Sequence, residues 1–151
     1  WQPPAFEDAA GGGKILQVVS GVATSAQEIT STTFVDVTDV TADITPAATS
    51  SKVLVIVCSQ FSTPESTYQG SYTLLRDAVD LGDSTGGIGG MNCGPGDNRY
   101  SGNMGFTIVD SPSSVSTLTY KLQAKKQTGG TSFNVNAQDV PSTIVLMEIG
   151  A

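Results

Sequence analysis

Apolar and polar residues alternate with a period of two along most of the chain, which is the pattern of half-buried β-strands. The alternation is clearest in "STLTYKLQAKK", where apolar residues from Leu118 to Ala124 are separated by polar ones. No window of eleven or more residues repeats apolar positions with helical spacing. We therefore expect eight to ten short strands in an all-β fold, an antiparallel β-sandwich that is jelly-roll-like.

Three stretches break this alternation because they are apolar on both faces, namely Ile15–Val19, Val53–Cys58 and Ile144–Ile149. A two-layer sandwich buries only the inner face of each sheet, so the outer faces of these strands need a second cover. That cover is either a loop or the N-terminal arm, or another copy of the chain, since symmetric oligomers bury such faces. We expect a homotrimer in which the last stretch, with Glu148 as its lone charge, packs near the symmetry axis. The candidate interface residues are Leu54, Ile56, Val145 and Met147.

Length and turn residues suggest one domain with an appendage. We expect residues 1–13 to form an extended N-terminal arm and residues 14–151 to form the sandwich, because "WQPPAFEDAAGGGK" has two prolines and a glycine triplet and no periodicity. Trp1 and Phe6 make this arm either a disordered tail or an attachment arm whose aromatic anchors grip another chain.

Turn signals locate further junctions. Asp77–Ala78 is expected to separate two short strands, and Gly129–Gly130 is expected to form a hairpin leading into "SFNVNAQ". In that strand we expect Phe133, Val135 and Ala137 to face inward and Asn134 and Asn136 to face outward.

A long glycine-rich loop is expected from Gly82 to Asn103. Loops of this length are uncommon unless they have a function. The candidate receptor-contact residues are Asn92, Asp97, Asn98, Arg99 and Tyr100, and with Tyr68 and Tyr72 they include aromatic groups on which a sugar can stack. The alternative is that the loop packs against itself or a neighbouring subunit.

Composition narrows the function classes. Charged residues make up 14% of the chain, against about 25% in an ordinary soluble domain, and the net charge is −7. Nucleic-acid binding is not expected because basic residues are not clustered, and membrane insertion is not expected because no apolar run approaches about 20 residues. A surface rich in Ser, Thr, Gly and Asn is typical of extracellular or virion proteins.

The residues of common catalytic and metal sites are absent or poorly spaced. The chain has no histidine, which excludes Ser-His-Asp triads, Cys-His pairs and His-bearing zinc sites. Asp77, Asp80 and Asp83 lack the spacing of a calcium loop and are interpreted as turn residues. Cys58 and Cys93 resemble neither a disulfide framework nor a metal site, and a bond between them is left open. We expect no enzyme activity, no cofactor and no metal.

Five segments in order, "GGGKILQVV", "ITPAATSSKVLVIV", "YTLLRD", "VDSPSSVSTLTYKLQAK" and "STIVLMEIGA", resemble the C-terminal β-sandwich domain of tail-fibre and virion structural proteins of tailed bacteriophages. The resemblance covers Gly11 to Ala151. It implies a sandwich that is often trimeric and lies on the virion surface, and it implies no catalytic residues.

The function implied is an oligomeric tail-fibre tip or receptor-binding domain, whose partners are its own copies, other virion proteins and a host surface glycan. Only a short segment precedes the domain, whereas a fibre protein of this type has a long shaft. This departure leaves a capsid (head) decoration or cement protein as the alternative. A carbohydrate-binding module outside a virion is a third hypothesis.

Overall fold

The computed structural model describes residues 13–63, 69–92, 100–127, 132–136 and 139–150. Within these ranges the chain forms eleven strands and no α-helix. The strands are β1 (Ile15–Ala23), β2 (Gln27–Ile29), β3 (Val35–Ile44), β4 (Lys52–Thr63), β5 (Gln69–Arg76), β6 (Val79–Asp80), β7 (Gly89–Asn92), β8 (Tyr100–Asp110), β9 (Leu118–Lys126), β10 (Phe133–Val135) and β11 (Ser142–Ile149).

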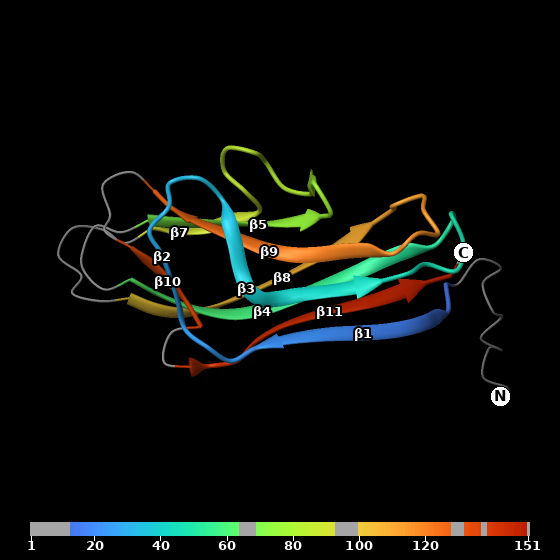
Figure 1. Cartoon of the computed structure of the whole chain (residues 1–151), viewed down its shortest axis with the longest axis horizontal. Helices are drawn as coiled ribbons and strands as arrows, with labels where there is room; N and C mark the ends of the chain where they lie inside the picture. The colour runs from blue at the N-terminus through green and yellow to red at the C-terminus, as the bar shows by residue number, and fades with distance from the viewer. Residues whose placement is uncertain (1–12, 64–68, 93–99, 128–131, 137–138, 151) are drawn as a thin grey trace, which may run out of the picture.

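The strands form two antiparallel sheets that face each other as two layers (Figure 1). One sheet has the order β1-β11-β4-β8, extended by β10 and β2 beside the far end of β4. The other has the order β3-β9-β5, with β6 and β7 both paired to β5. Successive long strands alternate between the two sheets, which is the jelly-roll arrangement of two Greek keys. The expected sandwich is confirmed, and the strand count exceeds the expected eight to ten because the short strands β2 and β7 were not anticipated.

The core lies between the two sheets and is built by alternate residues of each strand. In β4 the residues Val53, Val55 and Val57 are fully buried, while in β9 the buried residues include Tyr120 and Leu122. A row of stacked aromatic rings crosses the core, with centroid distances of 4.8 Å for Phe61–Phe133, 5.3 Å for Phe61–Tyr72 and 5.7 Å for Tyr72–Phe106. Each such ring buried adds about 1.5–3 kcal/mol to folding.

The expected hairpin at Gly129–Gly130 is wrong. Strand β9 belongs to one sheet, whereas β10 pairs with β2 and β4 in the other, so the chain crosses between layers here. The physical reason is the core itself, because Phe133 and Val135 are fully buried and Phe133 stacks on Phe61 of β4. The inward orientation expected for Phe133 and Val135 is confirmed, and Ala137 lies outside the described residues. The outward orientation expected for Asn136 is wrong, because its side chain is fully buried and its Nδ2 donates to the Ser25 carbonyl oxygen.

The stretch from Gly82 to Asn103 is also not a single loop. Its residues Gly89–Asn92 form β7 on β5, and β8 begins at Tyr100. Gly87 allows the approach because it has a φ of 77° and a Cβ there would lie 2.2 Å from the carbonyl oxygen of Tyr72. The two strands expected around Asp77–Ala78 are confirmed as β5 and β6, with Asp77 at a φ of 52° in the turn.

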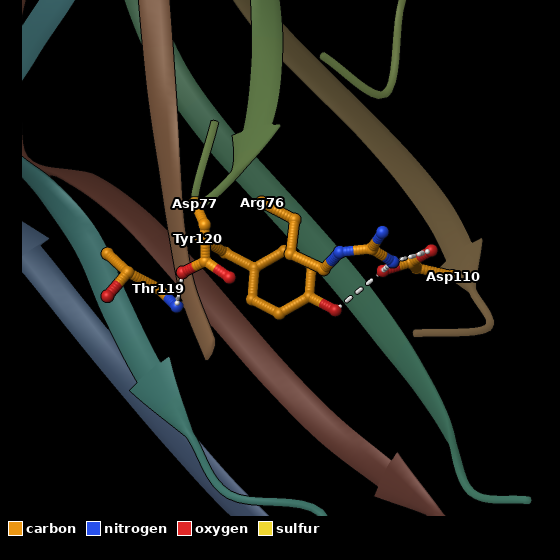
Figure 2. A network of polar contacts seen from close by, with 5 residues as sticks. All are labelled: Arg76, Asp77, Asp110, Thr119 and Tyr120. Carbon is orange, nitrogen blue, oxygen red and sulfur yellow. Dashed lines mark hydrogen bonds and ion pairs between the residues drawn. The ribbon is translucent and has the colours of Figure 1, made fainter. Parts of the chain in front are cut away.

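A polar cluster ties the two sheets together at the end of β8 (Figure 2). The Nη1 atom of Arg76 lies 2.8 and 2.7 Å from the two carboxylate oxygens of Asp110, and the Tyr120 hydroxyl donates to Asp110 Oδ2 over 2.7 Å. Arg76 and Tyr120 come from β5 and β9, and Asp110 comes from β8 in the opposite sheet. Burial is the main reason that the pKa of Tyr120 is raised, so its hydroxyl stays a donor. We refer to these three residues as the inter-sheet clamp.

Candidate assembly face

The three doubly apolar stretches lie side by side in one sheet. Strand β11 is hydrogen-bonded to β1 on one side and to β4 on the other, and β8 continues the sheet beyond β4. Figure 1 shows β1, β11 and β4 as adjacent ribbons on the same layer. Their inner residues face the core, and their outer residues meet on one surface.

Strand register arranges these outer residues in rows across four strands. The rows are Val18–Met147–Leu54–Val109, Ser20–Val145–Ile56–Thr107 and Val22–Thr143–Cys58–Gly105, and a shorter row of Ile15, Ile149 and Lys52 adjoins the first. We call the residues of these four rows the apolar face.

The apolar face is open to solvent in this chain. Its edge residues Val18, Val22 and Val109 have exposed fractions of 55%, 54% and 56%. The four interface candidates from the sequence are half-buried and lie at its centre, where Met147 is opposite Leu54 and Val145 is opposite Ile56. The contribution of β8 was missed, although Val109 alternates with the inward Ile108 and gave a usable signal.

Negative charge is absent from the apolar face, since none of the outward residues in these described rows is acidic and Lys52 at one end is the one charged residue among them. Glu148, the lone charge of the last doubly apolar stretch, points inward and is 1% exposed. Gln17 Nε2 donates to its carboxylate over 2.6 Å, and the hydroxyl of Ser51 and the backbone N–H of Ala47 each donate over 2.7 Å. These bonds, led by that from Gln17, hold the pKa of Glu148 below its ordinary value against the effect of burial.

One end of the apolar face is hollowed. Gly105 is opposite Cys58 in the register and carries no side chain, so a recess of about 400 Å³ opens there, bordered by Val140 and Pro141 from the segment before β11. Cys58 is a free thiol and is exposed in this recess. Cys93, with which a bond was left open, lies outside the described residues.

The candidate receptor-contact residues are only partly described. Tyr100 lies at the start of β8 with 48% of its surface exposed and borders a recess of about 160 Å³ that Phe61 and Tyr72 also line. Asn92 ends β7. Asp97, Asn98, Arg99, Tyr68 and the arm residues Trp1 and Phe6 lie outside the described ranges.

The outer face of the second sheet is polar. Lys121 Nζ and Gln123 Nε2 donate to the carboxylate of Asp36 over 2.8 and 2.6 Å, and these bonds hold the pKa of Asp36 below its ordinary value although burial acts in the opposite direction. Farther along the face, the Thr119 hydroxyl donates to Asp43 over 2.7 Å. We call this surface, the outward residues of β3, β9 and β5, the polar face.

Carboxylates of the β5–β7 segment have turn roles. Asp80 accepts hydrogen bonds from the Thr73 hydroxyl and the Gly82 N–H, and Asp83 accepts from the N–H groups of Thr85 and Gly86. Among the described residues there is no group of three or more Cys, Asp or Glu that can hold a metal ion. No helix long and apolar enough to cross a bilayer occurs in the same part of the chain.

Comparison with known proteins gives only a general likeness. Neither the protein-family models nor the curated proteins include a match. Among solved structures, the chain is similar to the VP2 subviral particle of infectious bursal disease virus, with 18% identity and a TM-score of 0.47 over 89% of this chain and 38% of that one. It is also similar to particles derived from a mutant VP2 of the same virus (16% identity, TM-score 0.47, 87% and 36% coverage) and to the Gx strain of that virus (16%, 0.46, 87% and 37%). The chain thus spans less than two fifths of each, and at these TM-scores the likeness carries no argument about function.

Proposed function

We propose that the chain is a structural protein of a virion, exposed on the virion surface, and specifically a trimeric tail-fibre tip or receptor-binding domain of a tailed bacteriophage. The observation that carries this proposal is the apolar face. An isolated secreted or cytosolic domain rarely exposes a contiguous apolar surface on this scale, and such surfaces mark sites of protein association.

Two further features support the same class of protein. The strand order is that of the jelly roll, a fold that recurs in viral capsid and lectin domains, although a fold alone supports a function only by analogy. The five sequence segments that resemble phage tail-fibre and virion structural proteins extend over nearly the whole chain. No residue with a catalytic role follows from either feature, so the proposed role is structural and not enzymatic.

A receptor-binding role finds support at the opposite end of β4 from Lys52. The recess beside Tyr100 is lined by the rings of Phe61 and Tyr72, with the bare backbone of Gly90 and Gly102 beside them. Aromatic rings and exposed backbone groups suit the stacking and hydrogen bonding by which a surface sugar is held.

The experiment is to detect the protein in purified particles of the virus that encodes it. Immunogold labelling is expected to place it at the tail, with a few to some dozens of copies per particle by quantitative mass spectrometry. Hundreds of copies on the head would support the capsid decoration alternative instead, and absence from particles would overturn the virion role. Replacing Tyr100 with Ala in assembled particles is expected to reduce adsorption to host cells if the recess contacts the receptor.

A further inference from the structure

We propose that further copies of this chain, each contributing the same face to the contact, cover the apolar face. This inference deepens the proposed function, on which it rests, by naming the partner of the assembly surface. The alternative occupants are the chain's own N-terminal arm, residues 1–12, and a different virion protein.

The size of the face fits a contact between copies. Four strands about 4.8 Å apart make it about 19 Å wide, and seven residues at about 3.3 Å each make it about 23 Å long. Two facing copies therefore cover roughly 900 Å² in plan, and more over protruding side chains, which reaches the roughly 1,000 Å² of a specific interface.

The charge distribution separates this face from the polar face. Each copy carries a net charge of −7, so random contacts between copies are repulsive. The acidic residues within the four strands of the apolar face, Glu148 and Asp110, point inward, where they are held by Gln17 and by Arg76. Copies that meet through the rows of this face therefore bury no carboxylate of these strands, while Lys52 remains at its end.

Surface relief supports the same occupant. The recess beside Cys58 is about 400 Å³, while Val18, Val22 and Val109 protrude from the edges of the same face. A surface with both a recess and protruding side chains can pack against a copy of itself, because in a symmetric contact the protruding side chains of each copy can enter the recess of the other. Cys58 then becomes inaccessible when copies associate.

The test compares Leu54→Asp with Leu75→Asp in the full chain. Leu54 lies outward on β4 between β11 and β8, and Leu75 lies outward on β5 between β9 and β6, so the same substitution is placed once in the apolar face and once in the polar face. Multi-angle light scattering from about 1 to about 100 µM measures the mass. We expect Leu54→Asp to raise the dissociation constant at least about 100-fold, because it buries an unpaired charge, and Leu75→Asp to leave it unchanged.

A second variant and a chemical probe guard against misfolding. Val109→Lys changes an exposed position, which the folded monomer tolerates, and it is also expected to prevent association. Alkylation of Cys58, followed by peptide mass spectrometry, is expected to be at least about tenfold slower in the associated wild type than in Leu54→Asp.

Each outcome decides the inference. A monomeric wild type at the highest concentration overturns it, as does association that none of the variants changes. Slow alkylation of Cys58 that does not depend on concentration and is abolished by deleting residues 1–12 shows that the arm is the occupant and also overturns it. A dimer supports the inference but contradicts the trimer of the proposed function, and association of a protein absent from particles leaves the inference standing while the proposed function fails.

Discussion

Strands β9 and β11 have the same geometry and opposite chemistry. Each lies in the middle of its sheet, and the first eight residues of each alternate between buried and half-buried. The half-buried positions of β9 are Thr119, Lys121, Gln123 and Lys125, and those of β11 are Thr143, Val145, Met147 and Ile149. The two strands therefore have the same backbone arrangement, and their outer faces differ only in the side chains that they carry.

This difference shows that contacts within one chain account for the side chains of the polar face but not for those of the apolar face. The polar face finds partners within the chain, since Asp36 is paired with Lys121 and Asp43 accepts a hydrogen bond from Thr119. The apolar face gains nothing from being apolar unless something outside the described sandwich removes it from water. Alternation that fails on the outer side of a strand is therefore informative about association, and alternation that holds is informative about the fold.

The largest effect on folding is expected from the inter-sheet clamp, which fixes the two faces on opposite sides of the molecule. Asp110→Ala leaves the Arg76 guanidinium and the buried Tyr120 hydroxyl without their acceptor, and we expect it to lower the free energy of unfolding by about 2–4 kcal/mol. The matched control on the polar face is Asp43→Ala, whose exposed carboxylate accepts a hydrogen bond from the Thr119 hydroxyl. This substitution is expected to lower the free energy of unfolding by about 0.5 kcal/mol or less. Denaturant titration measures both, and equal losses would contradict the role of the clamp.

Much of the sandwich could be predicted because its signal is local. The alternation in Leu118–Lys126 specifies both the strand and its inward face, and the runs at Val53–Cys58 and Ile144–Ile149 identify strands with two apolar faces. The orientation of Glu148 was also available, because a period of two places it on the same side as Leu146 and opposite Met147.

Other features depend on the tertiary structure and have no local signal. The turn residues Gly129–Gly130 fit a hairpin, but the burial of Phe133 against Phe61 in the opposite sheet determines the crossing. Strand β7 was missed because glycine has little strand propensity and two of its four residues are glycine. The segment forms a strand through its pairing with β5. The rows of the apolar face require the register of four strands, which one strand's pattern cannot supply.

An intermediate effect on stability is expected from protonation of Glu148, which lies on the inner side of β11, a strand whose outer side forms part of the apolar face. Its folded pKa is lower than the ordinary value of 4.5, so its contribution to stability is fully present above that value and is lost as the pH falls through the folded pKa. We expect Glu148→Gln to lower the free energy of unfolding by about 1–3 kcal/mol near neutral pH, because the donors from Gln17, Ser51 and Ala47 lose a charged acceptor.

The pH series separates this residue from the other carboxylates. Between about pH 6 and about pH 3, the wild type is expected to lose more stability than Glu148→Gln, so that the two curves converge in acid. Parallel curves would show that the pKa of Glu148 is the same in the folded and unfolded states, which would contradict the hydrogen-bonded site.

The smallest effect distinguishes the two faces by salt. The Lys121–Asp36 pair on the polar face has a side-chain exposure of 28% and 54%, and a double-mutant cycle with alanine is expected to give a coupling of about 0.5 kcal/mol or less that decreases as salt is raised.

Association through the apolar face is expected to respond to salt in the opposite direction. Raising sodium chloride from about 50 to about 500 mM screens the repulsion between copies that each carry a charge of −7 and breaks no ion pair at the contact. The dissociation constant is therefore expected to fall slightly as salt is raised. A marked increase of the dissociation constant at high salt would mean that charged residues, and not the apolar rows, hold the copies together.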